Sequence, residues 1–272
     1  KQNLIYRIKH YTWCIMFLYG GYMFIDTHCH ISREDYEDID KVIKDDFDSG
    51  CSAILIIGCT SGMIKEALEI ANSHSGIYAA IGYHPDQASI YTEEDLIKLE
   101  ELLKNTKVVA IGEIGLDYHY GKDDKDKQIE LFEYQLRLAE KYNLPVSIHS
   151  RDAVKDTIDI LSKYKVKGSI HCFSGSLEVA KIYIKMGFYL GIGGVVTFKN
   201  SNLHKVIEIG LANIVLETDS PYLAPVPVRG SVNTSKNIVY IASYLAELLK
   251  IPVEAVYSIT SNNANFLFDF KK

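Results

Sequence analysis

Short apolar runs alternate with amphipathic segments eight times along the chain, and this alternation restricts the fold more than any other feature of the sequence. Residues 53–57 form a continuous apolar run, which predicts a strand buried on both faces. Residues 61–73, which follow, have the apolar spacing of a helix. Strands joined through helices run parallel, and eight such units close most simply into an α/β barrel of the (β/α)8 TIM type. An open doubly wound sheet is the alternative, but Thr27-His28-Cys29 replaces its glycine-rich first turn.

The pattern places residues 23–272 in one barrel domain. The predicted strands are 23–27, 53–57, 77–81, 108–111, 145–148, 168–170, 188–191 and 214–218, and the predicted helices are 36–49, 61–73, 92–104, 124–142, 153–164, 176–186, 201–209, 234–249 and 253–267. Residues 1–22 contain an apolar stretch that superficially resembles a signal peptide but is too short to span a bilayer. We expect residues 1–22 to be an extension outside the native fold, with Met23 as the natural start.

Composition limits the possible partners. The chain has 47% hydrophobic and 24% charged residues, which is ordinary for a globular protein, and its net charge is −6. A protein that held nucleic acid through a broad basic surface would not carry this charge, so any nucleic-acid contact must be local. Five scattered cysteines without a C-x-x-C motif indicate a reducing compartment and argue against a cysteine-only zinc site. We expect a cytoplasmic protein with no membrane association and no obligate protein partner.

Histidines and carboxylates follow the carboxyl ends of the predicted strands, where the active sites of such barrels lie. They are His28 and His30 (first strand), His84 (third), Glu113 (fourth), His149 (fifth), His171 (sixth) and Asp219 (eighth). Side chains alternate along a strand, so His28 and His30 should point the same way. An isolated H-x-H pair is more often structural, but five histidines at one rim with two carboxylates predict a metal centre.

Six predicted ligands are too many for one tetrahedral ion that keeps a water molecule, and they suit two divalent ions. We assign His28, His30, Glu113 and Asp219 to one ion. Glu113, His149 and His171 are assigned to the other, because Glu113 stands midway between the two sets of histidines. The ligand types accept Mg²⁺, Mn²⁺ or Zn²⁺ and do not choose among them. Water between the two ions would become the nucleophile, which predicts hydrolysis.

Six motifs in order resemble the TatD family of metal-dependent deoxyribonucleases, which belongs to the amidohydrolase-like barrels. They are Asp26-Thr-His-Cys-His30, Gly82-Tyr-His-Pro85, Gly112-Glu-Ile-Gly-Leu-Asp-Tyr118, His149-Ser-Arg151, His171-Cys-Phe-Ser-Gly175 and Glu217-Thr-Asp-Ser-Pro-Tyr222. The resemblance implies hydrolysis of DNA phosphodiester bonds, as a 3′–5′ exonuclease on single strands or ends, and a role in DNA repair. An amide or ester hydrolase of the wider group is the alternative. A non-catalytic metal-bound binding module is a third hypothesis, which the complete ligand set disfavours.

The resemblance also suggests roles for residues around the centre. It places His84 at the scissile phosphate as a donor or proton shuttle, so that His84 joins Glu113 and Asp219 as a predicted catalytic residue. A hydrogen-bonded turn histidine before Pro85 is the structural alternative. Arg151 and Arg229 are predicted phosphate contacts, and the alternative for Arg151 is a salt bridge across the rim.

Two further positions carry expectations. Glu217 lies two residues before Asp219 and hence on the same face of a strand, so it should orient a metal-ligating histidine, with a buried salt bridge as the alternative. Ser235 stands where the TatD family usually has a proline, which affects the shape of the loop after the eighth strand.

Overall fold

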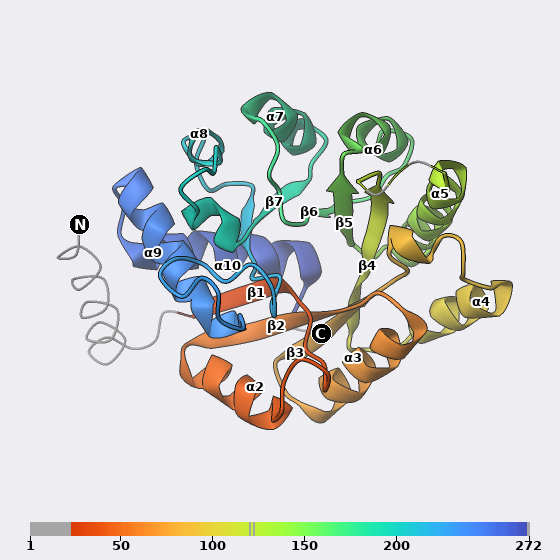
Figure 1. Cartoon of the computed structure of the whole chain (residues 1–272), viewed down its shortest axis with the longest axis horizontal. Coiled ribbons are helices and arrows are strands. Elements are labelled where there is room, and N and C mark those ends of the chain that lie inside the picture. The colour runs from red at the N-terminus through yellow and green to blue at the C-terminus, as the bar shows by residue number, and fades with distance from the viewer. Residues whose placement is uncertain (1–22, 120, 122, 271–272) are drawn as a thin grey trace.

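The computed structural model describes residues 23–119, 121 and 123–270. Eight parallel strands lie in sequential order, β1 to β8, in one sheet that curls into a nearly closed barrel. The helices surround the strands (Figure 1). The predicted (β/α)8 barrel is therefore confirmed. The expectation of an extension at residues 1–22 lies outside the described residues.

The strands and helices follow the predicted alternation. The strands are β1 (Phe24–Cys29), β2 (Cys51–Gly58), β3 (Ile77–Ile81), β4 (Val108–Asp117), β5 (Val146–Arg151), β6 (Gly168–Ile170), β7 (Tyr189–Ile192) and β8 (Ile214–Leu216). The helices are α2 (Ile39–Asp48), α3 (Ser61–Ser73), α4 (Glu93–Leu102), α5 (Lys125–Tyr142), α6 (Val154–Leu161), α7 (Leu177–Lys185), α8 (His204–Ile207), α9 (Ile238–Leu249) and α10 (Val253–Phe268). Short 3₁₀ helices are η1 (Pro85–Gln87), η2 (Gly194–Thr197) and η3 (Ser235–Asn237).

Two elements differ most from their predicted lengths. The helix predicted at 201–209 is only the single turn α8, and Gly210, three residues beyond it, adopts a positive φ. The strand predicted at 108–111 continues to Asp117, because its second half pairs with β5 from Ile114 to Asp117. Glu113 therefore lies within β4 and not after it.

Alternating side chains of β2 divide the core into two layers. Leu55 and Ile57 point into the barrel and pack with residues of other strands such as Val215. Ile54 and Ile56 point outward into the cluster that includes helix residues such as Leu68. Each of these side chains contributes roughly 1.5–3 kcal/mol on full burial. The interior is therefore filled, and only the carboxyl ends of the strands are left for chemistry.

Backbone and side-chain hydrogen bonds join β8 to β1 where the sheet order ends. The backbone N–H of Asp219 donates to the carbonyl of His28 (3.0 Å), and that of His30 donates to Ser220 (2.7 Å). The fully buried Asp26 carboxylate accepts from the Thr218 hydroxyl (2.6 Å). It also accepts from the hydroxyl of Ser235 (2.7 Å), so the residue that departs from the family pattern adds a hydrogen bond to the barrel closure.

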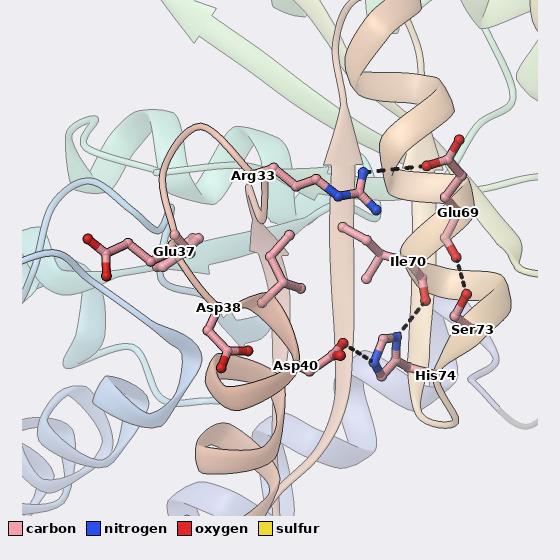
Figure 2. A pocket seen from close by; sticks show the side chains of 10 residues that line it. Arg33, Glu37, Asp38, Asp40, Glu69, Ile70, Ser73 and His74 are labelled. Carbon is pink, nitrogen blue, oxygen red and sulfur yellow. Dashed lines mark hydrogen bonds and ion pairs between the residues drawn. The ribbon is translucent and has the colours of Figure 1, made fainter.

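A cavity of about 800 Å³ lies on the outside of the barrel, between the segment after β1 and helix α3 (Figure 2). Four of its lining side chains form ion pairs. Arg33 contacts Glu69 (3.4 Å) and also Glu66 outside the lining (3.0 Å), and His74 Nε2 lies 3.1 Å from Asp40. These pairs join α2 and its preceding loop to α3, and none of the predicted metal ligands lines the cavity. Among the described residues, no helix has the length and apolar character needed to cross a membrane.

Candidate metal centre

Irregular strand pairing positions the first ligands. Between Ile111 and Ile114 strand β4 advances three residues while β5 advances two, from Val146 to Ile148. Such a bulge turns a side chain away from strict alternation, and here it lies at Gly112-Glu113. Strand β1 has a similar irregularity relative to β2 between Asp26 and Cys29. Both bulges therefore lie at predicted ligands.

The two oxygens of the Glu113 carboxylate face different sets of histidines. Oε2 lies 3.6 Å from His28 Nε2. Oε1 lies 2.6 Å from His149 Nδ1 and 3.3 Å from His171 Nε2. The carboxylate thus stands between the histidine of β1 and those of β5 and β6, in the position predicted for a bridge.

Asp219 extends the cluster on the side of β1 and β8. Its Oδ1 lies 3.6 Å from His30 Nε2, 3.8 Å from His28 Nε2 and 3.9 Å from His171 Nε2. The rings of His28 and His171 stack with centroids 3.5 Å apart. The structure therefore brings all six predicted ligands into one cluster at the carboxyl ends of the strands.

Carboxylates also lie against the outer nitrogens of the β5 and β6 histidines. His149 Nε2 is 3.1 Å from Asp117 Oδ2, and His171 Nδ1 is 3.2 Å from Glu217 Oε1, as expected for Glu217. A Cβ added at Gly191 would lie 2.1 Å from Glu217 Oε2, so glycine there leaves room for this carboxylate. Such outer partners fix the orientation of a ligating ring and increase its basicity.

Opposite charges dominate the electrostatics of the centre. Burial opposes ionisation of Glu113, but the charges of His171 and His149 hold its pKa well below the ordinary value. Burial likewise opposes protonation of His149, but Glu113 and Asp117 raise its pKa to about 10. In His28 burial prevails and lowers the pKa. Without a cation, protons on histidines balance these carboxylates, and a divalent ion would replace those protons.

A buried nitrogen without a partner supports the fit to metal ions. His28 Nε2, which faces Glu113 and Asp219, is buried and has no hydrogen bond within the part of the chain that the structure describes. His28, Glu113 and His171 each offer a ligand atom within 4.8 Å of the others. His28, His30 and Asp219 form a second such group. Imidazole and carboxylate donors at this spacing suit zinc, manganese or magnesium ions, so the residues present fit the predicted metals.

The predicted substrate contacts lie around this cluster. The His84 ring meets the His149 ring edge-on, with centroids 4.5 Å apart. His84 Nδ1 faces Asp86, with the carboxylate Oδ1 at 3.0 Å and the backbone nitrogen at 3.3 Å, as in the hydrogen-bonded turn given as the structural alternative. Arg151 is exposed at the end of β5. The exposed Arg229 guanidinium lies over the Phe198 ring, 4.2 Å from its centroid.

Two residues near the ligands were not predicted from the sequence. The Ser147 hydroxyl lies 3.0 Å from His28 Nδ1, although the two residues are 119 positions apart. Cys59 Sγ lies 3.9 Å from Glu113 Oε2. Strand alternation gives each residue a sequence signal: Ser147 lies two residues before His149, and Cys59 continues the inward alternation of residues 53, 55 and 57. No local signal pairs Ser147 with His28.

Comparisons with known proteins agree with the site. A family model described as TatD related DNase matches residues 25–269. The uncharacterized metal-dependent hydrolase YabD of Bacillus subtilis is 44% identical over 252 residues, which cover 90% of this chain and 99% of YabD. The uncharacterized metal-dependent hydrolase YcfH of Escherichia coli is 34% identical over 254 residues, covering 90% of this chain and 95% of YcfH. The crystal structure of YjjV, a TatD homologue from Escherichia coli K12, superposes with a TM-score of 0.83 at 31% identity and covers 90% of this chain and 98% of YjjV.

Proposed function

The chain belongs to the TatD-related DNase family of metal-dependent hydrolases, and from this premise we propose that it hydrolyses phosphodiester bonds in DNA. The observation that carries the proposal is the Glu113 carboxylate, with one oxygen toward His28 and the other toward His149 and His171. A bridging carboxylate between two sets of histidines is the arrangement that holds two cations a few ångströms apart.

We assign His28, His30, Glu113 and Asp219 to one divalent cation and Glu113, His149 and His171 to the other. Cations held there lower the pKa of water and stabilise negative charge on phosphate oxygens. Mg²⁺, Mn²⁺ and Zn²⁺ all remain compatible with the imidazole and carboxylate ligands.

Residues around the centre contribute binding and proton transfer. The imidazole of His84 lies beside that of His149, and we assign it to donate a proton to a phosphate oxygen or to the leaving group. Arg229 stacks on Phe198, which holds the guanidinium in place for a phosphate. Arg151 at the exposed end of β5 is the second proposed phosphate contact.

Charge favours the end of a strand as the substrate. The chain carries a net charge of −6, and a protein that follows a long duplex needs many basic contacts. A few cationic groups at the rim suffice for one or two phosphates of single-stranded DNA or a strand end. We therefore propose exonucleolytic digestion, with the 3′–5′ polarity and the repair role that the family resemblance implies.

The test is hydrolysis of end-labelled single-stranded DNA by the purified chain with Mg²⁺ or Mn²⁺. Stepwise shortening is expected, and both a chelator and Glu113→Gln should abolish it. Asp159→Asn, which removes an exposed carboxylate on α6, is the matched control and should keep full activity. No cleavage by folded, metal-loaded protein would exclude DNA and leave amide or ester hydrolysis as the alternative for the same centre.

A further inference from the structure

Cys59 directly follows Gly58, the last residue of β2, and its side chain continues the inward-facing series of that strand. Leu55 and Ile57 point into the barrel, and Cys59 belongs to the same interior cluster. The residue is buried, with 7% of its surface exposed. The sulfur therefore lies at the carboxyl end of the barrel, at the level where the other strands present their ligands.

The thiol lies among groups that suit a cation. Cys59 Sγ, a ring nitrogen of His30 and a carboxylate oxygen of Glu113 all lie within 4.8 Å of one another. The same Glu113 oxygen, Oε2, faces both Cys59 Sγ (3.9 Å) and His28 Nε2 (3.6 Å). His28 is fully buried, and its Nε2 has no hydrogen-bond partner in the described part of the chain. The unpartnered nitrogen indicates that a cation belongs at the Glu113 oxygen that the thiol also faces.

We propose that Cys59 is an additional ligand of the cation held by His30 and Glu113, and that its sulfur makes this position prefer zinc over magnesium. The proposal rests on the proposed metal centre. Thiolate is a soft ligand that zinc binds well, whereas magnesium takes oxygen ligands. Binding converts the thiol to a thiolate and releases one proton to solvent.

Without a cation the thiol has a simpler role. Burial raises the pKa of the Cys59 thiol, so the S–H remains protonated and can donate weakly to Glu113. If that hydrogen bond is its only role, the sulfur will make no bond to a bound metal. A spectroscopic measurement separates the two roles without reference to activity.

The experiment loads the metal-free full chain with Co²⁺ and records the near-ultraviolet absorption. A sulfur-to-cobalt charge-transfer band is expected in the unmodified protein. It should vanish in Cys59→Ser and in Cys59→Ala, with circular dichroism verifying that each variant folds. Cys51→Ser is the matched control, because Cys51 is buried at the opposite end of the same strand, and it should keep the band.

A competition titration measures the metal preference. The ratio of zinc to magnesium affinity should fall by on the order of tenfold or more in Cys59→Ser, the size of effect seen even when a group that only supports a ligand is removed. Bound cobalt without the band would overturn the cysteine proposal and leave the metal centre intact. A band that depends on Cys172, whose sulfur lies near His171 and Asp219, would overturn it too. No binding of any divalent cation would overturn the proposed function together with it.

Discussion

The two sides of the metal centre hold their histidines in different ways. On the β5–β6 side, the second nitrogens of His149 and His171 face the carboxylates of Asp117 (3.1 Å) and Glu217 (3.2 Å). On the β1 side, His28 Nδ1 faces the neutral hydroxyl of Ser147 (3.0 Å). Neither His30 Nδ1 nor His171 Nδ1 has a hydrogen bond within the described ranges, but His171 Nδ1 has the Glu217 carboxylate 3.2 Å away.

This difference distinguishes two effects of an outer partner, one on the orientation of the imidazole ring and one on the basicity of its metal-facing nitrogen. A hydroxyl fixes the direction of an imidazole ring, whereas a carboxylate fixes it and also makes the metal-facing nitrogen a stronger donor. His28 on the β1 side is the most deeply buried of the four histidines, at 0% exposure, and burial lowers its pKa. We therefore expect metal affinity on the β5–β6 side to depend on the outer carboxylates, and metal affinity on the β1 side to depend on the packing that holds the rings in place.

Loss of a ligand should have the largest effect and should be specific to one side. His171→Ala and His28→Ala each remove an imidazole that faces Glu113. Each variant is expected to bind about one cation instead of two and to lose on the order of a hundredfold or more in DNA hydrolysis, beyond the effect of losing an outer partner. Elemental analysis after gel filtration measures the bound metal. Two retained ions in either variant would show that the ligand assignment is wrong.

Glu217→Gln should have the next largest effect, because it keeps the shape of the side chain and removes the charge beside His171. The affinity for the β5–β6 cation should fall about 10–100-fold. Calorimetric titration with Mn²⁺ measures it, and the exposed Glu208→Gln is the matched control. An unchanged affinity would mean that the fully buried carboxylate serves only the backbone N–H of Cys172, from which it accepts a hydrogen bond (2.5 Å).

Asp117→Asn should lower the same affinity less, by about tenfold, at the bottom of the range for such partners. The side chain of Asp117 is 12% exposed while that of Glu217 is 0%, so solvent screens its charge more. The same calorimetric titration with Mn²⁺ shows which of the two variants loses more affinity. A larger loss for Asp117→Asn than for Glu217→Gln would contradict the argument from burial.

Ser147→Ala should have the smallest effect on metal affinity, less than about threefold, because it removes no charge. The cost should appear in stability instead, as about 1–3 kcal/mol lost from the free energy of unfolding when a buried nitrogen of His28 loses its partner. Urea unfolding of the metal-free chain measures this loss. Ser169→Ala is the matched control, since Ser169 is fully buried and its hydroxyl has no partner in the described structure. Metal affinity that falls as far as in Glu217→Gln would remove the distinction between the two sides.

The strand-end pattern predicted which residues gather but not how they are oriented. All six predicted ligands lie in one cluster, because parallel strands bring their carboxyl ends to the same rim. Their orientation depends on bulges in β1 and β4, which depend on register with neighbouring strands. The predicted strand 108–111 ends before Glu113 because the bulge in β4, between Ile111 and Ile114, interrupts the regular pattern of the strand there.

The sequence by itself determined the barrel, the order of its strands and the residues at their carboxyl ends, because hydrophobic periodicity and parallel connections are local properties. Only the tertiary structure decided which groups meet behind the ligands. Ser147 lies 119 positions from His28, and Glu217 reaches His171 through space that Gly191 leaves open. Such contacts join separate strands across the barrel interior, and their distances follow from the closure of the sheet and not from any short stretch of sequence.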